Sequence, residues 1–82
     1  MANKTDIRIK AEEAKRLKND PAFKGFMASV RETQISVFMD SEADDVSARE
    51  EAHAMVRALN QIEVNLDAAI AAETLLDRKQ RK

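Results

Sequence analysis

Small and apolar residues recur along the C-terminal half of the chain at alternating steps of four and three. A mean step of about 3.5 residues keeps one narrow stripe of a long helix facing a partner helix. The members of this stripe are Ala48, Ala52, Met55, Leu59, Ile62, Leu66, Ala69, Glu73 and Leu76. We therefore predict a helix over about 45–79 that packs lengthwise against another helix.

A second stripe with the same steps runs from Phe23 to Val37 and predicts a helix over about 21–40. Gln34 is its polar member, and it either sets the register of packing or is half exposed. Other apolar residues of this segment lie outside the stripe, so the helix is apolar on more than one face. We therefore expect it to contact something besides the 45–79 helix.

The N-terminal segment predicts a thinner amphipathic helix over about 5–19. Thr5 or Asp6 is expected to cap its start, because both side chains accept hydrogen bonds from free amides. Asp20 before Pro21 disfavours a continuous helix and favours a new one that Asp20 caps. The chain has one Gly and one Pro, so few other breaks are expected and the fold class is all-α.

The polar stretch 40–45 predicts a turn between two helical arms of nearly equal length. Closing the chain at this turn gives a long antiparallel helical hairpin whose first arm is kinked at Pro21. The alternative is a compact three-helix bundle in which the first helix folds back at residues 19–20. Glu73 also has two explanations. Either it is solvated where the long helix frays, or it pairs with Lys10 or Lys15 and fixes the register.

A two-armed hairpin encloses no core, because each helix covers only one stripe of the other. Large apolar residues left exposed on this scale usually mark an interface. We therefore expect copies of the chain to associate into a helical bundle or a ring. The predicted interface residues are Phe26, Ile35, Phe38, Met39, Val56 and Ile70.

The 82 residues are expected to form one domain, 1–82. The chain has no Cys and one His, His53, so no disulfide and no zinc site is expected. The acidic turn lacks the central Gly and the distal Glu of a calcium loop. No catalytic constellation is found, and we expect neither an enzyme nor a cofactor. With no apolar run of about 18 residues and no signal sequence, a cytoplasmic protein without membrane contact is expected.

Charge is unevenly distributed, although the net charge is −1. Residues 1–24 carry seven Lys or Arg and four Asp or Glu, 25–67 carry three and nine, and 68–82 carry four and two. In the hairpin both basic segments meet at one end, opposite the acidic turn. That end is either a solvated helix surface or a contact for DNA or an acidic partner. The candidate contact residues are Lys4, Arg8, Lys15, Arg16, Arg78, Lys79, Arg81 and Lys82.

The segment from Ala14 to Phe23, AKRLKNDPAF, resembles a motif of short helical proteins from tailed phages and prophages. Ala48-Arg49-Glu50 at the start of the long helix adds to the likeness. The resemblance implies a component of DNA packaging or head assembly, such as a small terminase subunit, a family that typically forms rings around a helical-hairpin core. It also implies a large packaging or portal protein as partner, in the cytoplasm of the host cell. The fuller family pattern has an N-terminal DNA-binding domain that this chain does not show, so the basic ends would have to contact DNA.

A different class of function also fits these features. The chain would then be a small helical dimer that regulates a protein partner or an RNA by gripping it along a helix face. A ring-sized oligomer in solution favours the assembly protein, whereas a dimer favours the regulator.

Overall fold

The computed structural model describes residues 3–80, and in this range it contains three α-helices. Helix α1 spans Lys4–Asn19, α2 spans Pro21–Asp40 and α3 spans Val46–Gln80. The all-α class is therefore confirmed, and the predicted boundaries agree with the observed ones to within one residue. None of the described helices combines the length and the apolarity needed to cross a membrane.

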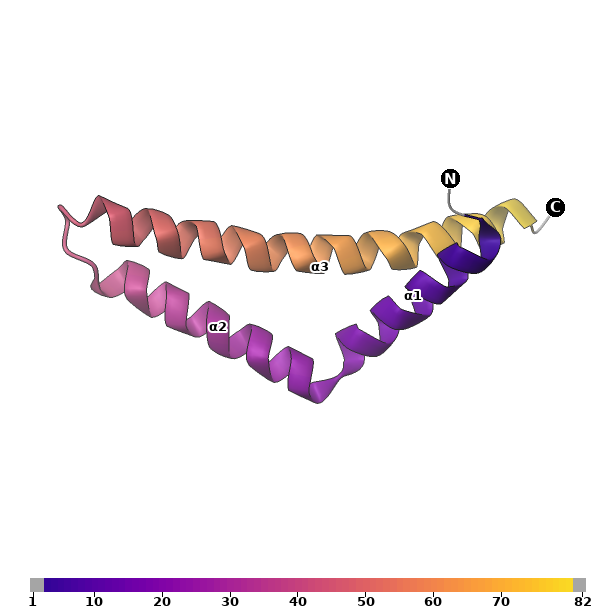
Figure 1. Ribbon diagram of the computed structural model, residues 1–82, viewed down its shortest axis with the longest axis horizontal. Coiled ribbons are helices and arrows are strands. Elements are labelled where there is room, and N and C mark those ends of the chain that lie inside the picture. The colour runs from indigo at the N-terminus through magenta and orange to yellow at the C-terminus, as the bar shows by residue number, and fades with distance from the viewer. Residues whose placement is uncertain (1–2, 81–82) are drawn as a thin grey trace.

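The three helices form a long, narrow triangle rather than a compact bundle (Figure 1). Helix α3 runs the whole length of the molecule, and α1 and α2 form a bent arm along it. Helix α2 packs on the N-terminal part of α3 and α1 on the C-terminal part, with little contact between α1 and α2. The molecule measures 58 × 25 × 19 Å along its principal axes.

The bend in the arm is produced by Asp20 and Pro21. Asp20 is extended, with φ −74° and ψ 119°, as expected for a residue that precedes proline. Its side chain accepts hydrogen bonds from the amides of Ala22 at 2.8 Å and Phe23 at 3.1 Å. The prediction that Asp20 caps the second helix is thus confirmed. Because α2 starts in a new direction, the arm bows away from α3 at this point (Figure 1).

The cap of α1 differs from the prediction. The helix starts at Lys4, and Asn3 accepts a hydrogen bond from the amide of Asp6 at 2.9 Å. The assignment of Thr5 or Asp6 as the cap was therefore wrong. Asn is as good a cap as Asp, and by capping earlier it places Asp6 in the first turn, where a carboxylate is favoured by the helix dipole.

The buried core is very small. The buried residues are Ala11, Ala14, Ala52, Leu59 and Glu73. Three of the four apolar members are alanines, so the helices meet over a narrow line of small side chains. Much of the apolar surface of residues 3–80 stays exposed.

Replacing Leu59 by Asp should unfold the chain. Leu59 is only 6% exposed, and an unpaired buried carboxylate costs several kcal/mol, comparable with the whole stability of a small domain. Helicity measured by circular dichroism should collapse at 25 °C. The matched control is Val64→Asp on the same helix, where the residue is 56% exposed and helicity should persist. Equal helicity in both variants would contradict the assigned core.

Candidate assembly surfaces and charged ends

The contact between α1 and α3 is held by ion pairs around one buried carboxylate. Glu73 is 8% exposed, and its Oε1 accepts a hydrogen bond from Lys15 Nζ at 2.6 Å. Arg8 lies 3.7 Å from the same carboxylate and also bonds Asp77 at 2.9 Å. The pairing of Glu73 with Lys15 is confirmed, and the alternatives of a solvated Glu73 and of a Lys10 partner are not what the structure shows.

These contacts stabilise the protonated form of Lys15. The hydrogen bond from Lys15 to Glu73 raises the pKa of Lys15 above its ordinary value of 10.5, with smaller contributions from the charges of Glu73 and Glu12. Lys15 therefore stays protonated throughout the neutral range. Further along the same helix pair, Lys18 bonds Asp67. Three cations of α1 are thus used to hold it on α3.

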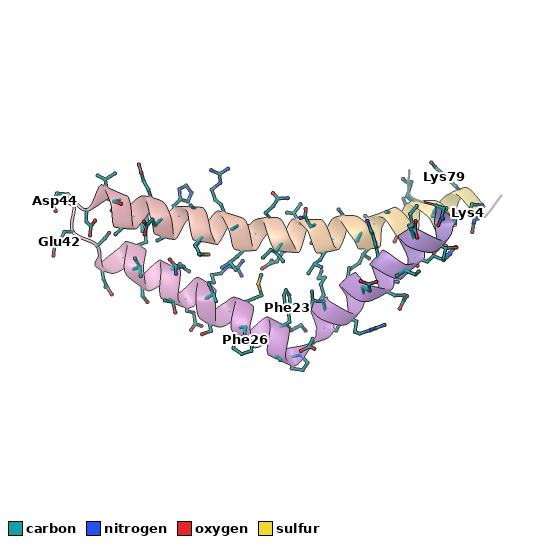
Figure 2. The ribbon with its side chains drawn as sticks, in the orientation of Figure 1. Lys4, Phe23, Phe26, Glu42, Asp44 and Lys79 are labelled. Atoms are coloured by element: carbon teal, nitrogen blue, oxygen red, sulfur yellow. The ribbon has the colours of Figure 1, made fainter. Side chains whose placement is uncertain are left out.

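The predicted basic end exists, but part of its charge is neutralised internally. Arg8 and Lys15 are engaged with carboxylates of α3, as described above. The candidates exposed and without an ion pair to another described residue are Lys4, Arg16, Arg78 and Lys79. Lys4 and Lys79 lie at the same end of the molecule (Figure 2). The remaining candidates, Arg81 and Lys82, lie outside the described residues.

The charge of the basic end is modest. Segments 3–19 and 67–80 together carry eight Lys or Arg and six Asp or Glu, a net charge of +2. The turn at the far end holds Asp40, Glu42, Asp44 and Asp45, and none of these forms an ion pair with another residue in the range 3–80. Figure 2 shows Glu42 and Asp44 at this end, opposite Lys4 and Lys79. Opposite charges are therefore separated along the long axis.

One side of the α2–α3 pair is identified by polar contacts between the helices. Arg31 donates hydrogen bonds to Asn60 at 3.0 Å and to Glu63 at 2.8 Å. Towards the turn, the guanidinium carbon of Arg49 lies 5.1 Å from the centre of the Phe38 ring. We call the side of α2–α3 that carries these five residues the charged side.

The flanks of α2 and α3 that lie opposite the charged side form a second surface. Val30 and Val37 lie on the flank of α2 away from Arg31, given 3.6 residues per turn. Met55 and Ile62 lie on the flank of α3 away from Asn60. Because the charged flanks of the two antiparallel helices lie together, these flanks must also lie together. We call the surface formed by Val30, Val37, Met55 and Ile62 the aliphatic side.

Residues of the aliphatic side were expected inside the two stripes, and here the structure differs from the prediction. They are 37–44% exposed rather than buried. The contact line between a bent arm and a straight helix is narrower than a coiled-coil stripe, so it buries one edge of the stripe and leaves the other edge in solvent. The four-three spacing locates these residues correctly but does not reveal which edge is covered.

The six predicted interface residues do not form one patch. Four of them, Ile35, Phe38, Met39 and Val56, line an apolar cavity of about 180 Å³ near the turn. Gln34, Ala52 and His53 complete the lining of this cavity. Gln34 is half-buried there, which is the second of its two expected states.

The other two predicted interface residues lie elsewhere. Phe26 points away from α3 near the bend, whereas Phe23 points towards it (Figure 2), and Phe26 is 73% exposed. Ile70 is half-buried on α3. Whether any of the six contacts another copy stays a prediction.

A second cavity, of about 260 Å³, lies beneath the bend. Phe23, Met27 and Leu66 supply apolar lining, and Arg31 and Glu63 also line it. Among residues 3–80 no three His, Asp or Glu side chains are grouped so that they could hold a metal ion.

Comparison of the chain with known protein families finds no matching family model, and searches of curated proteins and of solved structures find no match either.

Replacing Lys15 by Met should lower the melting temperature by several degrees. The substitution removes the closest partner of a buried carboxylate while keeping the length of the side chain, and an unpaired buried charge is costly. The double variant Lys15→Met/Glu73→Leu should recover the loss, because an apolar pair fills the same space without a charge. Thermal unfolding followed by circular dichroism measures both. A single variant as stable as the wild type would show that the pair does not stabilise α1 on α3.

Proposed function

We propose that the chain is a non-enzymatic helical assembly protein that associates with copies of itself through its exposed apolar surface. The observation that carries this proposal is the imbalance between buried and exposed apolar residues. Four apolar residues are buried, whereas thirteen large apolar residues of the described range are more than a third exposed. Exposed apolar surface of this extent marks interfaces in soluble proteins.

The total accessible area supports the same proposal. The chain exposes 6473 Å² for a mass of 9.2 kDa. A compact monomer of this mass exposes about 4,900 Å². The difference exceeds the roughly 800 Å² that each partner contributes to an ordinary protein interface. One interface of ordinary size would therefore remove about half of this excess area.

We further propose that this assembly serves phage DNA packaging or head formation, as a small terminase subunit does. The support is the resemblance of residues 14–23 and 48–50, together with the charge separation along the molecule. The exposed cations at the basic end would contact DNA backbone, and a large packaging or portal protein would be a further partner. The alternative is a dimeric regulator of a protein or an RNA, which the mass in solution distinguishes from a ring.

Light scattering at high protein concentration should give a mass well above 9.2 kDa for the wild type. Phe26→Asp should reduce this mass without loss of helicity, because Phe26 makes little contact within the chain. Val64→Asp places the same charge on the outer surface of α3 and should leave the mass unchanged. A folded monomer at all concentrations would contradict self-association.

Duplex DNA should bind the wild type at low salt and dissociate as salt is raised, because binding releases condensed counterions. Neutralising Arg78 and Lys79 as Arg78→Gln/Lys79→Gln should reduce the slope of log K against log salt by about 2. Arg57→Gln removes a cation distant from the basic end and should change little. Fluorescence anisotropy of a labelled duplex provides the measurement, and absence of binding at low salt would remove the proposed DNA role.

A further inference from the structure

We infer that two copies of this chain pair in antiparallel orientation through the aliphatic side, so that the basic end of each copy lies beside the acidic turn of the other. The inference rests on the self-association proposed above and specifies its surface and direction. Three observations carry it. They are the absence of cross-helix ion pairs on the aliphatic side, the charge separation along the long axis, and the position of Ile62 near the middle of α3.

Burial of the aliphatic side costs less desolvation free energy than burial of the charged side. Its four aliphatic residues are all partly exposed, and Thr33 and Ala58 lie on the same flanks. Glu51 and Asp40, both towards the turn, are carboxylates at its margin. Burial of such a surface removes apolar area from water with little loss of charge hydration.

The charged side would cost more to cover. Arg31 and Glu63 form their ion pair there, and the Glu63 side chain is 48% exposed to solvent. Arg49 lies over the ring of Phe38 on this side, and His53 lines the apolar cavity near the turn. The centre of a protein interface is depleted in charged residues, because desolvation of an ion pair offsets much of its attraction. A second copy of the chain is therefore expected on the aliphatic side.

The orientation follows from the charges of the two ends. In a parallel pair the four carboxylates of the turn would face the same four carboxylates of the partner, and the basic ends would also coincide. In an antiparallel pair Asp44 and its neighbours lie beside the exposed Lys4 and Lys79 of the other copy. Complementary charge favours the second orientation, and like charges disfavour the first.

The geometry of α3 suits a two-fold axis at its centre. The helix spans residues 46–80, so residue 63 is its midpoint and Ile62 is adjacent to it. In a pair of antiparallel α3 helices aligned along their whole length, Ile62 therefore lies next to the axis and faces Ile62 of the second copy. The rest of the aliphatic side, which lies towards the turn, then packs against the C-terminal half of α3 of the second copy, and this contact occurs twice, as a two-fold interface requires.

Single-cysteine variants test the orientation directly, since the chain contains no Cys. Ile62→Cys should form a disulfide-linked dimer under mild oxidation. Asp44→Cys and Lys79→Cys should each be poorly crosslinked alone by a short bis-maleimide, and the two should crosslink efficiently when mixed. Crosslinking of each end variant with itself, and not in the mixture, would show a parallel pair and overturn the inference while leaving self-association intact.

A second comparison tests which side is used. Val37→Asp on the aliphatic side should yield a helical monomer by light scattering. Ile35→Asp on the opposite flank of α2 places the same charge in a comparably exposed position and should remain at least dimeric. The reverse result would place the pair contact on the charged side and overturn the inference. A wild-type chain that is monomeric would instead overturn the proposed self-association itself.

Discussion

The structure depends on the contact between one continuous helix and an arm that bends in the middle. Helix α3 provides the surface on which both other helices lie, and neither α1 nor α2 has another extensive partner within the described chain. Because a straight helix and a bent arm touch along a narrow line, small residues occupy the closest approach. The shortage of buried area, the exposed aliphatic residues and the cavity beneath the bend all follow from this one geometric constraint.

Glu73 shows how the contact line is kept in register. An apolar residue at this position would pack on α1 equally well after a shift of one turn. A buried carboxylate that needs both Lys15 and Arg8 fits only one alignment. The ion pairs of Lys18 and Arg31 with α3 also restrict the alignment of the arm, at other points along its length. Register in this molecule is therefore set mainly by ion pairs, and close approach is set by alanines.

Much of this fold could be predicted from the sequence because its signals are local. The break at Asp20 and Pro21, the polar turn and the four-three spacing each depend on neighbouring residues, and all located their helices to within one residue. The cap of α1 was misplaced because Asn3, Thr5 and Asp6 have similar capping ability. The extent of burial could not be predicted, since it depends on how far the bent arm diverges from α3. For the same reason, the sequence did not predict that the six interface residues lie at three separate places, which are the cavity near the turn, the outer face of α2 near the bend and a half-buried position on α3.

The two halves of the bent arm are attached to α3 by different forces. Helix α1 is held by two buried alanines and by cations paired with Glu73, Asp67 and Asp77, whereas α2 has no buried residue and is held by the half-buried Phe23 and Met27 and by the single cation Arg31. Screening by salt weakens partly exposed ion pairs but not apolar contacts. The helix before Pro21 therefore depends on more salt-screened ion pairs than the helix after it, so that a rise in ionic strength loosens the two halves of the arm unequally.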